Sequence, residues 1–265
     1  MVGCGWLGEP LAIALHACGH YVVGTTTTPA KAERLQRAGI AAHVLDLNTS
    51  LSDELIGVLT ACDRLFVSVP PGRGYADVVT RYPSWMRKLL AADNGTARWI
   101  FTSSTGVYGR ARGWVDEQTP PCPERDSPRA VLAAEQVLRA SLGARLTVLR
   151  LAGLAGGDRE PGRWLAGRRG LPNGDAPVNL IHRDDVVALG IAALEAVGSP
   201  AACYNVCADL HPPKAAYYRT RARRLELEPP TFLPGGGNGK RIANTRVKTD
   251  FAYRLKWPDP STFPL

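Results

Sequence analysis

The chain has 265 residues, of which 45% are hydrophobic and 21% are charged. This balance is typical of soluble globular proteins and excludes a disordered, fibrous or coiled-coil chain. Lys and Arg outnumber Asp and Glu by 32 to 24, a formal net charge of +8, but the two signs are interleaved along the chain. The excess positive charge favours anionic ligands without indicating which one.

The distribution of apolar residues and cysteines bears on location and metal binding. No apolar run approaches the roughly 20 residues of a membrane-spanning helix. Leu11–Cys18 resembles a short secretory segment, but Glu9 rather than a basic residue precedes it, and His16 interrupts it. The closest cysteines, Cys203 and Cys207, lack the spacing of a metal site. We therefore expect a cytoplasmic protein with reduced cysteines, no metal and no membrane partner; export is the weaker alternative.

Short apolar runs alternate with segments of helical spacing over the first 150 residues. The helical segments include one around Leu11 and one around Leu138, each with further apolar residues on the same face. This alternation predicts a parallel sheet covered by helices, an α/β fold of the doubly wound kind. The predicted strands are Tyr21–Thr25, Ile40–Leu45, Arg64–Val69, Arg98–Thr102, Arg145–Leu151 and Ala202–Val206.

The rhythm changes after residue 150, where loops rich in Gly, Pro and Arg surround predicted helices at Asp184–Ala196 and Pro213–Leu225. We expect a nucleotide-binding domain over 1–150 and a smaller substrate-binding region over 151–265, partly interleaved with it. Arg219, Arg221, Arg223 and Arg224 lie along the second of these helices. Without an aromatic platform they predict a solvated helix face rather than a nucleic-acid interface.

A glycine motif opens the chain. Gly3-Cys4-Gly5-Trp6-Leu7-Gly8 is a G-x-G-x-x-G at the start of a predicted helix, the pattern that brings backbone close to a dinucleotide pyrophosphate in Rossmann-type folds. Only Met1 and Val2 precede Gly3, whereas a strand usually needs about five residues. We expect either that the sequence starts several residues into its first strand or that a strand of two or three residues still pairs.

The residues at the end of the predicted strand Tyr21–Thr25 bear on the choice of cofactor. Thr25–Thr28 carries no carboxylate to hold the ribose hydroxyls of NAD, and Lys31 and Arg34 follow. Hydroxyls with nearby cations suit a 2′-phosphate, so NADP is favoured and NAD remains the alternative. One threonine could instead cap the next helix, and Asp46 either approaches the adenine or forms a turn. The predicted cofactor-binding residues are Gly3, Gly5, Trp6, Leu7, Gly8, Thr25, Thr26, Lys31, Asp46, Leu47, Val69, Pro70 and Ser103.

Several motifs together resemble one superfamily. Thr102–Gly109 reads T-S-S-T-G-V-Y-G, and Leu132–Leu138 and Val178–Val186 add further matches. With the glycine motif they are similar to the extended short-chain dehydrogenases/reductases, which include the NAD-dependent epimerases/dehydratases. Leu149–Gly156, Pro161–Arg163 and Trp257–Pro260 resemble the atypical, YeeZ-like group within it. The resemblance covers essentially the whole chain and implies a Rossmann-type fold and a nicotinamide cofactor.

The resemblance also implies site residues, with one departure. Ser104 matches the serine that hydrogen-bonds the reacting oxygen of the substrate. The superfamily then requires a Tyr-x-x-x-Lys pair, where this chain has Ser127 and Val131. Neither residue can replace a tuned phenol and its lysine. Tyr108 and His182 are candidate proton donors in their place, although each also suits a structural role.

Arg163 and Trp164 lie in a glycine-bounded loop and are candidates for binding an anionic substrate. Gly235–Lys240 does not match a phosphate-binding P-loop. The sequence thus predicts an NAD(P)-dependent oxidoreductase of the epimerase/dehydratase-like type, acting on an anionic small molecule or a nucleotide sugar. The alternative is a non-catalytic NAD(P)-binding sensor or scaffold. A homodimer is implied by the resemblance alone.

Overall fold

The computed structural model describes residues 1–72, 76–196 and 202–264. They form two compact units, each built from several stretches of chain. The predicted division at residue 150 is one of the points where the chain passes from one unit to the other. The first unit holds Met1–Val107, Pro123–Arg150 and Val187–Cys203, and the second holds Tyr108–Cys122, Leu151–Val186 and Tyr204–Leu265.

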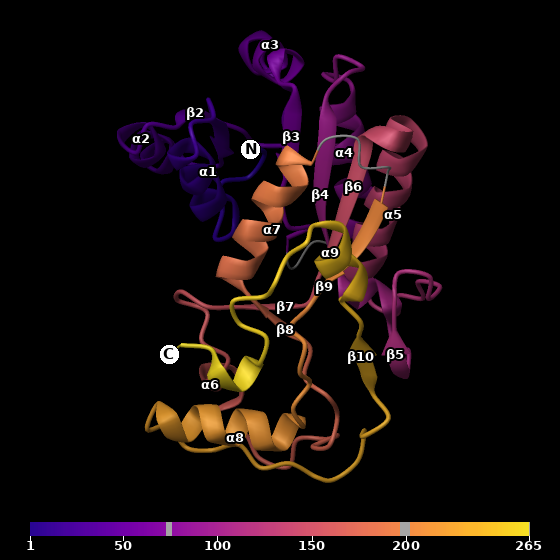
Figure 1. Ribbon diagram of the computed structural model, residues 1–265. Helices are drawn as coiled ribbons and strands as arrows, with labels where there is room; N and C mark the ends of the chain where they lie inside the picture. The colour runs from indigo at the N-terminus through magenta and orange to yellow at the C-terminus, as the bar shows by residue number, and fades with distance from the viewer. Residues whose placement is uncertain (73–75, 197–201, 265) are drawn as a thin grey trace. The chain divides into compact units, whose positions relative to one another are not determined.

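All six predicted strands are confirmed, with ends that move by at most two residues. The elements that lie mainly in the first unit are α1 (Gly8–Ala17), β1 (Val23–Thr26), α2 (Pro29–Arg37), β2 (Ala41–Val44), α3 (Asp53–Ala61), β3 (Arg64–Val67), α4 (Val78–Leu90), β4 (Arg98–Ser104), α5 (Asp126–Leu142), β6 (Leu146–Leu151) and α7 (Arg183–Glu195), the last reaching into the second unit (Figure 1). Short 3-10 turns η1 (Thr105–Tyr108) and η2 (Gly143–Arg145) join them.

The residues ahead of the glycine motif join two groups of strands. β1 pairs with β2, and β3, β4, β6 and β9 (Ala202–Val206) follow one another in a second group. Met1 N donates to Val23 O of β1 at 2.6 Å, and Thr25 N returns a bond to Met1 O at 2.9 Å. On the other side, Val2 N donates to Phe66 O of β3 at 2.8 Å. The short opening segment therefore pairs on both sides and lies at the centre of the sheet.

Helices cover both faces of this sheet, as predicted. Phe101 of β4 contacts Tyr82 of α4, with ring centroids 6.3 Å apart. Phe66 of β3 points to the opposite face, because successive side chains alternate and Phe66 is paired with Ile100 rather than Phe101. There it lies against Gly190 of α7. The alternation thus places α4 on one face and α7 on the other, which makes the unit doubly wound.

The second unit is built from short elements around its own core. Its pairs β10–β5 and β7–β8 are parallel, and each strand has three residues, too few to show a period in the sequence. Ala155, Val178, Tyr217, Tyr218 and Phe263 are among the core residues. The elements are β5 (Gly113–Val115), β7 (Gly153–Ala155), α6 (Gly162–Leu165), β8 (Leu180–His182), α8 (Lys214–Arg224), β10 (Lys240–Ile242), α9 (Thr245–Asp250) and η3 (Pro260–Thr262).

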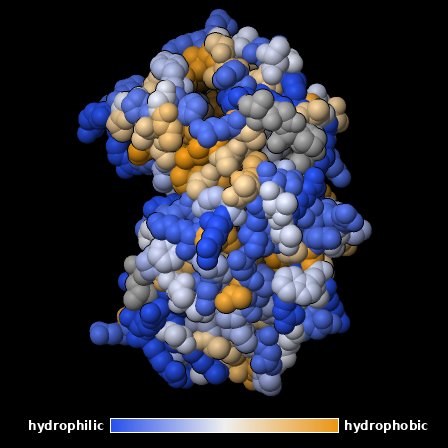
Figure 2. Space-filling model, in the orientation of Figure 1, coloured by the Kyte–Doolittle hydropathy of each residue, from blue (hydrophilic) through white to orange (hydrophobic). Residues whose placement is uncertain are grey.

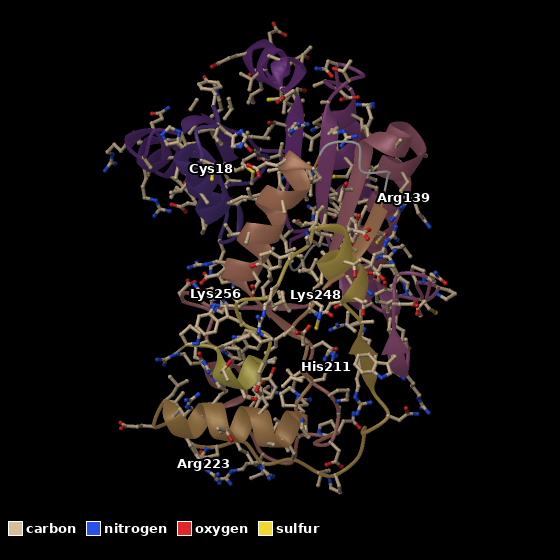
Figure 3. The ribbon with its side chains drawn as sticks, viewed as in Figure 1. Cys18, Arg139, His211, Arg223, Lys248 and Lys256 are labelled. Carbon is tan, nitrogen blue, oxygen red and sulfur yellow. The ribbon has the colours of Figure 1, made fainter. Side chains whose placement is uncertain are left out.

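The arginines of α8 do not form one solvated face, and that prediction is wrong for Arg221. Its side chain is 1% exposed and forms an ion pair with Glu160, while Arg223 is exposed (Figure 3). A buried guanidinium requires a carboxylate partner. The partner lies 61 residues away in the sequence, so the helical pattern alone could not identify it.

No helix in the described residues is both long and apolar enough to cross a bilayer. The visible surface is mostly hydrophilic, with apolar residues gathered over α7 in the upper half of Figure 2.

Gly190→Leu tests the packing of α7 on the sheet. A Cβ at Gly190 would lie 3.0 Å from Leu11 Cδ2 and 3.2 Å from Phe66 Cε2. We expect a loss of about 1–3 kcal/mol in the free energy of unfolding, because the interface has no room for the side chain. The measurement is chemical denaturation. Gly57→Ala on α3 is the matched control: it meets nothing within 4 Å and should gain about 0.5–1 kcal/mol. Equal effects at the two positions would contradict this packing.

Candidate functional site

The glycine turn has the geometry that the motif predicts. Gly3 has φ +91°, and a Cβ there would lie 2.9 Å from Ser68 O and from Val69 Cγ2. A Cβ on Gly8 would lie 2.2 Å from Gly3 O. Gly5, in contrast, faces open space. The first and third glycines are therefore required by packing. The second leaves the approach to the turn and to the start of α1 open, which suits a pyrophosphate.

The other residues of the motif, together with Thr25 and Thr26, pack around this turn. Cys4 and Leu7 are buried and Trp6 is half-buried. Thr25 is 4% exposed, and its Oγ1 accepts a hydrogen bond from Gly3 N at 3.0 Å. Thr26 is buried beside it. Thr25 thus braces the glycine turn, a role that sequence reasoning missed, and a contact of either threonine with a cofactor stays a prediction.

A carboxylate that sequence reasoning missed holds the two predicted cations. Glu9, one residue after the motif, lies 3.2 Å from Lys31 Nζ and 2.7 Å from Arg34 Nη2. Its side chain is 21% exposed, against 25% for Lys31 and 59% for Arg34. The three residues place two positive charges around one negative charge, beside the first turn of α1. The only signal in the sequence is the position of Glu9 directly after Gly8.

The loops after β2 and β3 carry the other predicted cofactor residues. Asp46 Oδ1 accepts a hydrogen bond from Asn48 N at 2.9 Å, so Asp46 forms a turn. Leu47 O accepts from Lys88 Nζ of α4 at 2.6 Å. Val69 is half-buried near Gly3, and Pro70 is exposed. An adenine contact of Asp46 stays a prediction.

The backbone oxygen of Val69 also accepts a hydrogen bond from the Tyr82 hydroxyl at 2.6 Å. Burial raises the pKa of Tyr82 far above its ordinary value, so the phenol stays protonated as a donor. This bond fixes the backbone of the β3 loop against α4.

A buried ion pair supports the end of β4. Glu135 of α5 is 1% exposed and accepts from Arg150 Nη2 at 2.7 Å and Nε at 3.0 Å. The hydroxyl of Ser103 donates to the same carboxylate. Arg139, labelled in Figure 3, lies 3.9 Å from it on the exposed side of α5. Ser103 therefore uses its side chain to tie β4 to α5, and its predicted cofactor contact is untested.

Ser104 stands at the last position of β4 and is half-buried. Its Oγ accepts a hydrogen bond from Gly106 N at 3.0 Å. This bond uses one lone pair of the hydroxyl and does not use its proton. The geometry is that of a positioned donor at the carboxyl end of a parallel strand, where ligands of open α/β sheets bind.

The start of α5 holds Ser127 and Val131, the residues that the resemblance aligns with the Tyr-x-x-x-Lys pair. Ser127 is exposed and Val131 is buried, one helical turn apart. A Cβ on Gly106 would contact Pro128 of this turn at 3.3 Å. In the first unit, the start of α5 therefore lies against the segment that follows Ser104.

Tyr108 is buried and hydrogen-bonded within the second unit. Its side chain is 1% exposed, and its hydroxyl donates to Asn205 Oδ1 at 2.8 Å. Asn205 N in turn donates to Glu117 Oε1 at 2.7 Å. This arrangement favours the structural interpretation of Tyr108 over a role as proton donor.

His182 caps a helix. Its Nδ1 accepts a hydrogen bond from Asp184 N at 3.2 Å, the bond of an N-cap residue, and the ring lies 5.3 Å from Trp257 and 5.2 Å from Phe263. Nε2 then carries the proton and has no hydrogen-bond partner among the described residues. Burial lowers the pKa of His182, so the ring is neutral at pH 7. These contacts favour a structural role here too.

The predicted substrate residues lie on α6 of the second unit. Arg163 is exposed, and Trp164 is 42% exposed. Glu160 positions this short helix, because its Oε1 accepts from Gly162 N and from Arg221 Nε, both at 2.9 Å. Arg163 and Trp164 are thus held on a supported turn with their side chains accessible.

The doubly wound sheet with a glycine turn at its centre and a serine at the end of β4 defines the class: a Rossmann-type fold of the short-chain dehydrogenase/reductase kind. No family model matches the chain. The protein YeeZ of Escherichia coli K12 is 38% identical over 273 residues, covering 100% of this chain and 98% of YeeZ. The chain therefore belongs to the YeeZ-like group of atypical extended short-chain dehydrogenases/reductases.

Two further comparisons agree with this family. A 3-diazoavenalumate denitrifying reductase of a Streptomyces species is 30% identical, over 87% of this chain and 82% of its own. A solved structure from Methylobacillus flagellatus, provisionally assigned as an NAD-dependent epimerase/dehydratase, has a TM-score of 0.72 and 28% identity, with 97% of this chain and 92% of that chain covered.

The buried histidine predicts a pH dependence of stability. The pKa of His182 in the folded state is lowered from its ordinary value of 6.5, so below that pH the unfolded state binds more protons and stability falls. His211, whose pKa burial also lowers, acts in the same direction. We expect the free energy of unfolding to fall between pH 7 and 5, by at most about 1.4 kcal/mol per pH unit for each histidine.

His182→Asn is the variant that tests this assignment. Asn is a good N-cap that does not titrate, so the fall in the free energy of unfolding towards pH 5 should become shallower. Urea denaturation at a series of pH values measures it. If the free energy of unfolding of the variant falls towards pH 5 as it does in the unmodified protein, His182 does not cause the fall.

Proposed function

We propose that this protein is an NADPH-dependent oxidoreductase that reduces an anionic small molecule. The observation that carries the proposal is the pair of cations, Lys31 and Arg34, held by Glu9 beside an open glycine turn. A 2′-phosphate is a dianion that suits two cations, whereas NAD offers only hydroxyls there. The reductase named among the relatives supports the same class of reaction.

The residues present fit a dinucleotide. Gly3 and Gly8 shape the turn, Gly5 leaves it open, and the first turn of α1 follows directly. The backbone of this turn would hold the pyrophosphate, and Lys31 and Arg34 the 2′-phosphate. The nicotinamide, when bound, supplies a hydride to the substrate.

Ser104 orients the substrate in this proposal. Its hydroxyl proton is not used by the bond from Gly106, so it donates to the substrate atom on which negative charge develops. Ser127 and Val131 supply no tuned acid beside it. The chemistry is therefore best suited to electron-poor substrates that accept a hydride without a strong proton donor, the final proton coming from water.

Arg163 of the second unit, an exposed guanidinium followed in the sequence by the accessible Trp164, supports an anionic ligand. A fork of N–H donors binds carboxylate or phosphate, and an indole ring stacks on a planar or sugar ring. A nucleotide sugar satisfies both conditions, as does a small aromatic carboxylate.

The absence of the Tyr-x-x-x-Lys pair supports a second candidate. The glycine turn, Lys31 and Arg34 are present, whereas Ser127 and Val131 stand at the start of α5. Such a chain could bind NADPH without turnover and act as a sensor or scaffold. The two functions share cofactor binding and differ in whether any substrate oxidises the bound NADPH.

Lys31→Ala and Arg34→Ala test the cofactor. Each removes one charge-assisted contact, so the Kd for NADPH should rise about tenfold or more, while the Kd for NADH changes less than about twofold. Calorimetry with the four nicotinamide cofactors measures both. Arg37→Ala, an exposed cation in the last turn of the same helix, is the matched control and should leave both affinities unchanged. Equal losses for NADH and NADPH would contradict recognition of the 2′-phosphate.

Ser104→Ala tests catalysis. We expect kcat to fall about 100-fold for a substrate found by screening anionic electrophiles, because one oriented donor is lost, while NADPH affinity is retained. The readout is oxidation of NADPH, and Ser84→Ala on the exposed side of α4 is the control. Tight NADPH binding with no oxidation by any compound of the screen would favour the sensor or scaffold.

A further inference from the structure

Helix α4 bonds to the backbone of two loops in the first unit, one after β2 and one after β3. Lys88 Nζ donates to Leu47 O at 2.6 Å and to Thr49 O. From the same helix, the Tyr82 hydroxyl donates to Val69 O. Both loops leave the carboxyl ends of parallel strands, the edge at which ligands of open α/β sheets bind. One helix therefore holds two of the loops that carry predicted cofactor residues.

The loop after β2 makes its other hydrogen bonds within itself. Asp46 Oδ1 accepts from Asn48 N, and Asp46 O accepts from Thr49 N at 3.1 Å and from Thr49 Oγ1 at 2.9 Å. These bonds fix the shape of the turn without attaching it to another element. Within the described residues, the hydrogen bonds that link residues 46–49 to the rest of the unit both come from Lys88. The buried side chain of Leu47 adds packing.

The chemistry of a lysine suits this task. An ammonium group has three donors, and bonds from a charged donor are stronger than those from a neutral one. One half-buried side chain thus holds two carbonyls of a single turn. A loop that is already ordered binds its ligand more tightly, because the apparent affinity falls with the fraction of molecules in the competent conformation.

We propose that Lys88 is a positioning residue for the adenosine half of the cofactor. It holds residues 46–49 in the conformation that receives the adenine and its ribose, and it does so through the backbone, without touching the nucleotide. Tyr82 holds the loop after β3 in the same way. This inference rests on the proposed function, because it concerns the cofactor site proposed there.

Lys88→Met tests the positioning role, because it keeps the length of the side chain and removes the ammonium group. The Kd for adenosine 2′,5′-bisphosphate should rise about five- to tenfold. In the free protein, amide hydrogen exchange at Asn48 and Thr49 should become at least about tenfold faster. Lys88→Arg still offers donors to both carbonyls and should keep the Kd within about twofold of its original value. Calorimetry measures the Kd.

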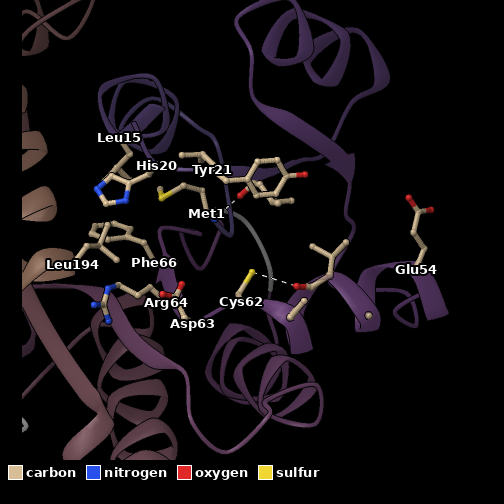
Figure 4. A pocket seen from close by; sticks show the side chains of 15 residues that line it. Met1, Leu15, His20, Tyr21, Glu54, Cys62, Asp63, Arg64, Phe66 and Leu194 are labelled. Carbon is tan, nitrogen blue, oxygen red and sulfur yellow. Dashed lines mark hydrogen bonds between the residues drawn. The ribbon is translucent and has the colours of Figure 1, made fainter. Parts of the chain in front are cut away.

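Two control variants separate positioning from general stability. Arg87→Met removes an exposed cation from the same helix and should change neither the Kd nor the exchange rates. Leu194 of α7 is 6% exposed and lines a cavity of about 810 Å³ in the first unit (Figure 4). None of the described residues that line this cavity belongs to residues 46–49 or to α4. Leu194→Ala should therefore lower Tm at least as far as Lys88→Met does and leave the Kd unchanged.

The outcomes distinguish this proposal from the proposed function. An unchanged Kd in Lys88→Met, or an equal rise in Leu194→Ala, would overturn the positioning role alone, provided that the unmodified protein binds NADPH. If the unmodified protein binds neither NADPH nor adenosine 2′,5′-bisphosphate, the proposed function fails and the positioning role fails with it.

Discussion

The pairing of the opening segment on both sides is the constraint on which the first unit depends. Met1 and Cys4 bond to β1, and Val2 bonds to β3 in both directions, with Ser68 N donating to Val2 O at 2.9 Å. Without these bonds, β1 and β2 would form a pair separate from the other strands. The glycine turn follows within the same residues, so the hydrogen bonds that assemble the sheet also place the candidate cofactor site.

Elsewhere, buried ion pairs join helices and strands to one another. In the first unit, Glu135 joins α5 to β6 through Arg150 and to β4 through Ser103. In the second, Glu160 and Arg221 join α6 to α8. Removing one partner of such a pair leaves an unpaired buried charge, which costs several kcal/mol. Each pair therefore specifies one packing arrangement. Glu135 accepts a hydrogen bond from Ser103, the neighbour of Ser104, and Glu160 accepts one from Gly162 N at the start of the helix that carries Arg163 and Trp164.

The family to which the chain belongs does not by itself decide the reaction, because one fold supports many chemistries. At the candidate site, Ser104 ends β4, and α5 begins against the segment that follows it. The resemblance aligns Ser127 and Val131 with the superfamily's tyrosine and lysine. Tyr108 and His182 are bonded and buried. These facts favour chemistry in which the cofactor and a hydrogen-bond donor are sufficient.

Local pattern predicted the strands of the sheet, the glycine motif and helix α8, because each is encoded by neighbouring residues with a period of two or 3.6 or by consecutive glycines. Tertiary structure alone decided the partners of the buried charges. Glu160 and Arg221 are 61 residues apart, and Glu9 and Arg34 are 25 apart. The three-residue strands of the second unit were also beyond prediction. These contacts form only when segments that are far apart in the sequence fold against each other. The residues next to each partner in the sequence therefore do not specify them.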